Sequence, residues 1–236
     1  MIKKILKTKI ITLILSNKWI SKKILKNSTI ILVYHGVSKN PPMFHKIFNL
    51  NIEPKLFEKQ IIWIKKNFNI ISPQDIVENN YKKPAAMITF DDGDRSYLKH
   101  ASPILKKHNI SSIIFLNMEV IKGNISWAGL VTYLANMNKE FKDYYIKKNS
   151  KINDQSFLRF KKNMIESFLK KRNKSKIYKD IRKYSGNFLS LNDIKKLDKN
   201  RLVFFGNHLY NHYNAINISD ETLKTQYIKN QKEIDK

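Results

Sequence analysis

The stretch AAMITFDDG, residues 85–93, carries the strongest fold signal in the chain. Its first six residues are uncharged and mostly apolar, as in a strand buried on both faces, and Asp91, Asp92 and Gly93 end that run abruptly. Two adjacent carboxylates are therefore expected at the end of a buried strand. Asp-Asp-Gly is also a common turn and helix-capping sequence, so this stretch alone leaves a plain turn open.

A second apolar run, residues 202–205, is followed by His208 and His212. Histidines four residues apart share one face of a helical turn, so this spacing predicts that both imidazoles reach one cation. Together with Asp92 they would form a set of three ligands that leaves a position for water, as in a catalytic zinc-type site. A histidine pair at this spacing can also arise by chance, and the placement of all three residues after apolar runs favours the metal site.

Strand-like and helix-like patterns alternate along the chain, which predicts an α/β fold with parallel strands joined by crossover helices. The expected strands are residues 30–34, 70–71, 85–90, 112–116 and 202–205, and the expected helices include 54–68, 96–108 and one from about 219. About five strands are too few to close a barrel, so an exposed sheet edge is expected. Functional residues of such barrels collect at the carboxyl ends of strands.

Histidines outside the predicted ligand set are expected to differ in their roles. His35 follows a predicted strand and could line the site, although a lone histidine there is as often a structural hydrogen-bonding residue. No such placement is predicted for His45, His100 and His108, which are expected on the surface or in helices.

The same segments resemble motifs of the polysaccharide deacetylase family, also called the NodB-homology or carbohydrate esterase family 4-like domain. Residues 89–93, TFDDG, are similar to its first motif, and residues 208–212, HLYNH, to its second motif, His-Ser/Thr-x-x-His. Residues 31–37, ILVYHGV, resemble the opening strand of the bacterial members. The resemblance runs from about residue 29 to the C-terminus and is interrupted by a long central insert.

This resemblance implies a distorted (β/α) barrel that removes acetyl groups from an N-acetylated polysaccharide or oligosaccharide with a divalent metal, zinc being the first choice. It implies Asp91 as the catalytic base, and as metal ligands Asp92, His208 and His212. Leu209 departs from the pattern, because the family has Ser or Thr there, whose hydroxyl would brace the ligand loop. The later motifs, which supply an arginine near the base and a histidine general acid, would lie beyond Lys236.

Two functions follow from this combination of matching and missing motifs. The first is a carbohydrate deacetylase that hydrolyses a C–N amide bond and is weak or inactive as this chain. The alternative is a non-catalytic deacetylase remnant that binds glycan or a membrane surface. Whether the reading frame downstream encodes the missing motifs separates the two.

The charge composition limits the kinds of binding partner that are expected. A formal net charge of +26 in 236 residues would suit nucleic acid or an anionic membrane. Almost all of this charge is lysine, whereas phosphate and base recognition favours the bidentate fork of arginine, so no nucleic-acid partner is expected. The arginines are Arg95, Arg159, Arg172, Arg182 and Arg201. The chain has no cysteine, which excludes disulfides and thiolate ligands.

The N-terminal segment, residues 1–28, carries eight lysines and no acid, interleaved with apolar residues. Its apolar stretch at 10–15 is too short for a secretory signal or a membrane span, so a cytoplasmic protein is expected. A basic amphipathic helix in peripheral contact with a membrane is one interpretation, and a helix packed on the barrel with solvated lysines is the other. The remaining residues, 29–236, are predicted to form the deacetylase-like domain, with a helical insert at 118–190.

Overall fold

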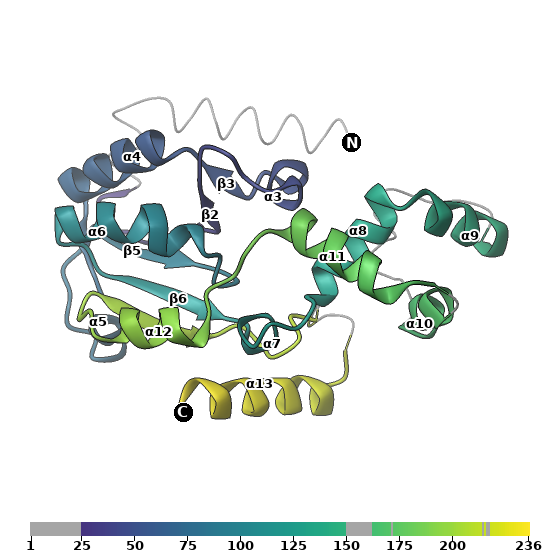
Figure 1. Cartoon of the computed structure of the whole chain (residues 1–236). Helices are drawn as coiled ribbons and strands as arrows, with labels where there is room; N and C mark the ends of the chain where they lie inside the picture. Colours follow the sequence, from purple (N-terminus) through teal and green to yellow (C-terminus); the bar gives the residue numbers. More distant parts are fainter. Residues whose placement is uncertain (1–24, 150–161, 171, 214, 216–217) are drawn as a thin grey trace, which may run out of the picture.

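The structure of the chain is a computed structural model, which describes residues 25–149, 162–170, 172–213, 215 and 218–236. A five-stranded parallel sheet forms its centre (Figure 1). The strands are β1 (Thr29–Tyr34), β4 (Asn69–Ile70), β5 (Ala85–Phe90), β6 (Ser112–Leu116) and β7 (Val203–Asn207). They confirm the predicted strands and the α/β class.

The central position of β5 explains its sequence. The sheet runs in the order β1-β5-β6-β7, while β4 pairs with the first two residues of β5. All six residues of β5 are buried, and parallel strands covered on both faces have continuous apolar sequences rather than alternating ones. Because every strand is parallel, the carboxyl ends of β1, β5, β6 and β7 meet at one edge of the sheet.

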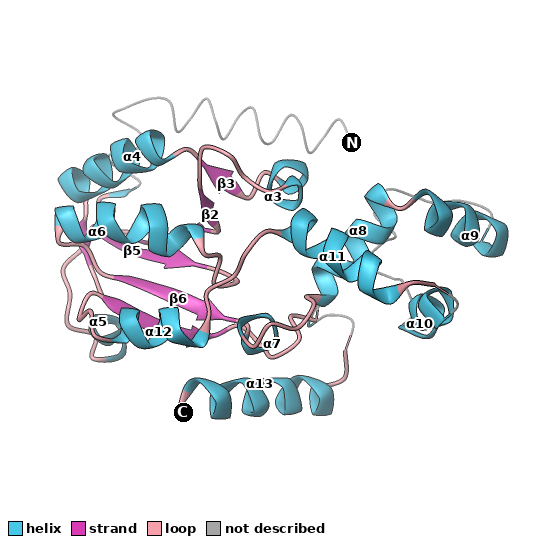
Figure 2. Ribbon diagram, in the orientation of Figure 1, coloured by secondary structure: helices cyan, strands magenta, loops and turns pink. Residues whose placement is uncertain are grey.

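One face of the sheet holds the main core. It is covered by α4 (Pro54–Asn67), by the continuous helical stretch η1 (Tyr97–Ala101) and α6 (Ser102–His108), and by α12 (Leu191–Asp198), as Figure 2 shows. Phe57, Ile88 and Tyr97 are among the buried side chains of this layer. The predicted helices 54–68 and 96–108 are therefore confirmed within one or two residues.

The opposite face is more open. It carries a small cluster that includes Met87 and Ile113. In the register of the sheet Ile31 lies beside Met87, yet Ile31 and Val33 are 56% and 55% exposed. In the described part of the chain β1 and β7 form the two edges of the sheet, which agrees with the expectation of a barrel that is not closed.

The described residues between 118 and 190 are largely helical. They form α7 (Met118–Ile121), α8 (Trp127–Met137), α9 (Lys139–Asn149), α10 (Lys162–Lys170) and α11 (Lys174–Ser185). Helices α8 to α11 lie beyond the carboxyl ends of the strands in Figure 1 and pack around a separate apolar cluster that includes Leu134, Phe141 and Phe168. A helical insert was predicted here, and its limits at 118 and 190 stay a prediction.

Short elements complete the fold. A two-stranded pair, β2 (Gly36–Val37) and β3 (Asn51–Ile52), frames α3 (Met43–Phe48). The short α5 (Pro73–Val77) begins with a capping box in which Ser72 and Asp75 bond reciprocally. The last helix, α13 (Asp220–Ile234), begins after Ser219, whose hydroxyl accepts from the Thr222 amide, as its sequence predicts.

The membrane prediction concerns a part of the chain that is mostly outside the described residues. The basic segment 1–28 lies outside them up to position 24. Among the described helices, none combines the length and the apolar character needed to cross a bilayer.

Candidate metal centre

The end of β5 directs two adjacent carboxylates to different partners. Asp92 has a left-handed backbone with φ 68°, which aspartate tolerates better than most residues, and Gly93 follows with φ 69°. This turn sends the Asp91 carboxylate toward His35, at 3.9 Å from Oδ2 to Nε2, and the Asp92 carboxylate toward the two downstream histidines. This geometry therefore allows the two aspartates to take different roles, as predicted.

The two histidines converge, but not through a helix. Residues 208–212 form a loop, so the prediction that the pair shares one face of a helical turn is wrong. Leu209 and His212 have φ of 61° and 53°, and left-handed residues at these positions cannot continue an α-helix. The loop nevertheless places Nε2 of His208 and Nε2 of His212 each 3.4 Å from Oδ1 of Asp92.

The spacing of these donors fits a tetrahedral metal. Asp92, His208 and His212 offer a carboxylate oxygen and two imidazole nitrogens that all lie within 4.8 Å of one another. Two ligands bound tetrahedrally at about 2.0–2.1 Å are about 3.3 Å apart, close to the 3.4 Å between each histidine and Asp92. One carboxylate and two imidazoles is also a ligand set that zinc accepts in hydrolases.

The ionisation of the three groups is coupled. Burial acts to raise the pKa of the Asp92 carboxyl, but the hydrogen bond from His208 and the charge of His212 outweigh it and lower that pKa to about 2. Burial acts to lower the pKa of His208, and its contact with Asp92 raises it above the ordinary value. At His212 burial prevails and the pKa is lowered. A carboxylate and an imidazole that readily loses its proton are the forms that metals bind.

His35 joins the site from the neighbouring strand. It follows β1, and the amide of Asp91 donates to the carbonyl of Tyr34 at 2.9 Å, so the two strand ends are fixed side by side. The side chains of His35 and Asp91 are 23% and 21% exposed, which leaves both accessible to a substrate. His35 therefore lies beside Asp91, as a residue lining the predicted site would.

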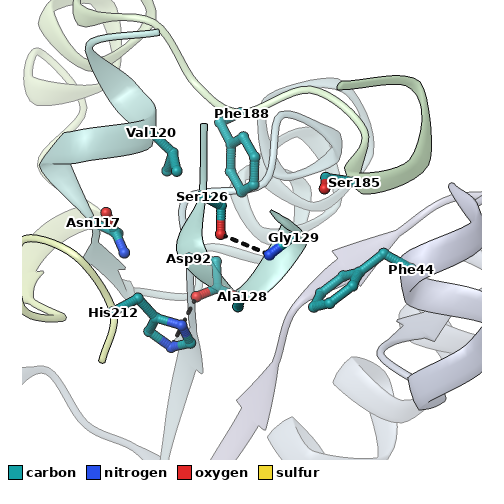
Figure 3. A pocket seen from close by; sticks show the side chains of 10 residues that line it. All are labelled: Phe44, Asp92, Asn117, Val120, Ser126, Ala128, Gly129, Ser185, Phe188 and His212. Carbon is teal, nitrogen blue, oxygen red and sulfur yellow. Dashed lines mark hydrogen bonds and ion pairs between the residues drawn. The ribbon is translucent and has the colours of Figure 1, made fainter. Parts of the chain in front are cut away.

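A small cavity adjoins the metal-ligand set (Figure 3). The space open to the centre of a water-sized group is about 20 Å³, enough for roughly one water molecule. Its lining residues come from α3, from the segments after β5, β6 and β7, and from the α7–α8 and α11 region: Phe44, Asp92, Asn117, Val120, Ser126, Ala128, Gly129, Ser185, Phe188 and His212. The insert helices thus form one wall beside the candidate ligands.

Two buried polar atoms in this cavity wall lack a hydrogen-bond partner in the described part of the chain. They are Oδ1 of Asn117 and Oγ of Ser185, in residues that are 3% and 5% exposed. A Cβ atom at Gly129 would collide with Oγ of Ser185, so glycine is what allows α11 to approach α8 this closely. No motif in the sequence marks Asn117, Gly129 or Ser185 as residues of the site.

Another histidine lies closer to the site than expected. His45 belongs to α3 but is only 4% exposed, and its Nε2 atom lies 3.7 Å from Oδ2 of Asp94. The expectation of a surface or helix residue is confirmed by its place in α3, where it is buried. His108, at the end of α6, bonds to Glu58 at 3.0 Å, away from the candidate ligands.

Comparisons with known proteins agree with the fold and the motifs. The family model described as polysaccharide deacetylase matches residues 78–236, more than half of the chain. The poly-beta-1,6-N-acetyl-D-glucosamine N-deacetylase of Staphylococcus epidermidis is 29% identical over 105 residues, which cover 39% of this chain and 36% of that protein. The Bacillus subtilis protein YxkH is 30% identical over 92 residues, which cover 36% of this chain and 30% of that protein.

Each alignment therefore spans about a third of the length of these curated relatives. Among solved structures, the Streptococcus pyogenes deacetylase PplD in complex with acetate has a TM-score of 0.52 and 18% identity, over 87% of this chain and 66% of that chain. That similarity shows the fold. The family match over residues 78–236 establishes that this chain belongs to the polysaccharide deacetylase family.

Proposed function

We propose that this chain is a metal-dependent hydrolase that removes N-acetyl groups from the amino sugars of a glycan. The observation that carries the proposal is the convergence of His208 and His212 on one carboxylate oxygen of Asp92, at 3.4 Å each. These three residues would hold the metal. When bound there, a divalent ion, with zinc the first choice, supplies Lewis-acid polarisation of the acetyl carbonyl and a more acidic water.

Asp91 and His35 would move the protons. Asp91 as general base takes a proton from the attacking water, whose oxygen forms the new bond to the acetyl carbon. As the C–N bond breaks, His35 as general acid delivers a proton to the leaving nitrogen. The products are acetate and a free amine. The 3.9 Å between His35 Nε2 and Asp91 Oδ2 supports this pairing, because an acid and a base must both reach the same small reacting group.

Under this proposal turnover depends on His35. It lies beside the proposed base Asp91 and would supply the proton that the leaving nitrogen needs.

The cavity beside the ligands suits the acetyl group. Val120, Phe188 and Phe44 give it an apolar lining next to Asp92 and His212, and its small size matches a methyl group better than a longer acyl chain. The name of the Staphylococcus epidermidis relative, which acts on poly-beta-1,6-N-acetyl-D-glucosamine, favours a polymer of N-acetylglucosamine as substrate. Peripheral membrane contact through residues 1–28 remains a separate prediction.

The test is release of free amine from N-acetylglucosamine oligomers by the purified, zinc-loaded chain. Both β-1,6 and β-1,4 linked oligomers are assayed, with His212→Ala as the matched control. We expect turnover by the wild type, strong inhibition by a chelator and recovery on adding zinc. Turnover that survives both the chelator and His212→Ala would contradict the proposal, as would no turnover on any acetylated oligomer.

A further inference from the structure

The last helix, α13, lies along the end of β7 and next to the loop that carries the two histidines (Figure 1). A surface helix normally buries an apolar stripe. In α13 the buried residues are instead two amides, Gln226 at 8% and Asn230 at 0% exposure, while Ile234 packs at the margin of the main core. The docking of this helix therefore relies on directed hydrogen bonds, which specify one position more narrowly than apolar contact does.

Asn230 ties together the ends of two strands. Its Oδ1 accepts from the amide of Met118 at 2.9 Å, and its Nδ2 donates to the carbonyl of Leu116 at 2.8 Å. The same Nδ2 group donates to Oδ1 of Asn207 at 2.9 Å. The carbonyl of Leu116 also accepts from the amide of His208 at 3.1 Å. One buried side chain thus fixes the end of β6, the end of β7 and the start of the ligand loop.

Gln226 holds the other end of that loop. Its Oε1 accepts from the amide of Asn211 at 2.7 Å, next to the ligand His212. Between the two anchors, Oδ1 of Asn207 accepts from the amide of Leu209 at 3.0 Å. The loop is therefore bonded at 208, 209 and 211 to groups that α13 holds.

The loop needs such support because of its backbone. Leu209 and His212 adopt positive φ, a conformation that residues with a Cβ rarely adopt and that persists only where the surroundings impose it. Leu209 has no side-chain hydroxyl or amide with which to brace the loop itself. In this chain the restraint comes from the side-chain amides of Gln226 and Asn230 in α13.

We propose that Gln226 and Asn230 are positioning residues, which hold the loop in its left-handed conformation so that His208 and His212 meet at Asp92. They act on the ligands through backbone amides. The functional meaning of this inference rests on the proposed metal site. An apolar residue of similar volume could dock the helix equally well, so a loss in metal binding that exceeds any loss in stability is what separates positioning from packing.

The experiment compares two variants of Gln226 with a matched control. Gln226→Met keeps the length of the side chain and removes the acceptor, while Gln226→Glu keeps an acceptor oxygen. The control Thr225→Met introduces the same side chain at an exposed position of the same helix. We expect zinc affinity, measured by chelator competition, to fall about 10- to 100-fold in Gln226→Met, to be largely restored in Gln226→Glu, and to be unchanged in Thr225→Met.

Two further readouts report the geometry itself. The visible absorption spectrum of the cobalt-loaded protein should change in Gln226→Met, because it depends on the arrangement of the ligands. Hydrogen exchange in the metal-free protein should be faster at the Asn211 amide in Gln226→Met and unchanged there in Thr225→Met. If methionine prevents folding, Gln226→Asn, which is too short to reach Asn211, replaces it in each measurement.

The outcomes separate this inference from the proposed function. Wild-type zinc affinity together with wild-type protection of Asn211 in Gln226→Met, or in Gln226→Asn, would overturn the positioning role. Another outcome is that the wild-type protein binds no metal while Gln226→Met still speeds hydrogen exchange at the Asn211 amide. That outcome would support the positioning role of Gln226 and refute the proposed metal chemistry.

Discussion

The Nε2 atom of His35 lies 3.9 Å from Oδ2 of Asp91. These residues follow β1 and β5, which pair in parallel along their full length, so the contact is fixed by the sheet. The Asp91 carboxylate lies beside His35, whereas the Asp92 carboxylate lies beside His208 and His212. The strand ends thereby separate the proposed proton-transfer pair from the proposed metal ligands.

A first prediction tests His35 as the general acid. His35→Gln should keep its zinc and lose about 10²- to 10⁴-fold in kcat, because the leaving amine would lack a positioned proton donor. His108→Gln, on the outer helix α6, serves as control and should be near wild type. If the activity of His35→Gln is within threefold of the wild type, His35 is not the general acid.

A second prediction separates ligand from base. Asp91→Asn should bind zinc as the wild type does and lose turnover, since an amide cannot accept the proton of water. Asp92→Asn should weaken zinc binding itself, because a charged ligand is replaced by a neutral one. Chelator competition and amine release measure the two effects. The reverse pattern would exchange the roles.

A third prediction concerns acid stability of the metal-free protein. The pKa of the Asp92 carboxyl is lowered from 3.8 to about 2 by His208 and His212, against the effect of burial. A carboxyl whose pKa is lower in the folded than in the unfolded protein stabilises the fold above pH 3.8. That stabilisation is lost as the pH falls toward about 2. The pKa shifts of the two histidines are opposite in sign, so their effects oppose each other near neutral pH.

Urea unfolding of metal-free protein across this acid range measures the effect. The wild type should lose more stability between pH 4 and pH 2 than Asp92→Asn, which has no proton to take up there. Asp180→Asn, on helix α11 and outside the set of candidate ligands, is the control and should follow the wild type. Equal acid sensitivity of the wild type and Asp92→Asn would show that the Asp92 carboxyl is not held ionised by the histidines.

The sequence and the structure agree where local pattern decides the outcome. The run 85–90 is apolar without a break because β5 is buried on both faces, and Ser72 and Ser219 begin helices because their hydroxyls bond the first amides. Asp92, His208 and His212 were predicted as one site, and their side chains do converge.

The sequence could not reveal what depends on tertiary contacts. The spacing of His208 and His212 suits a helix, but left-handed residues at 209 and 212 make a loop, and such backbone states depend on partners far along the chain. Those partners include Gln226, which bonds to the loop at Asn211. Its sequence context predicts only an ordinary surface residue in a polar helix. The burial of His45 beside Asp94 depends on how α3 folds onto β2 and is equally hidden.

A fourth prediction tests the cavity as the acyl pocket. Val120 is 5% exposed and lines the cavity, so Val120→Ala should make room for a longer acyl group. The ratio of kcat/KM for N-propionyl over N-acetyl substrate should rise about 10-fold or more, within the range that one methylene commands in an apolar pocket. The control Val77→Ala changes a side chain that is 81% exposed and should leave the ratio unchanged. An unchanged ratio in Val120→Ala would show that this cavity does not bind the acyl group.

The most direct test of the account is the metal content of the purified protein. Elemental analysis after dialysis against a trace of zinc should find about one ion per wild-type chain, because Nε2 of His208 and Nε2 of His212 each lie 3.4 Å from Oδ1 of Asp92, close to the spacing of two tetrahedral ligands. His212→Ala should retain little of it, and His100→Ala, which changes a histidine of η1 outside this set, should retain all of it. Equal zinc in the wild type and His212→Ala, or none in the wild type, would contradict the account.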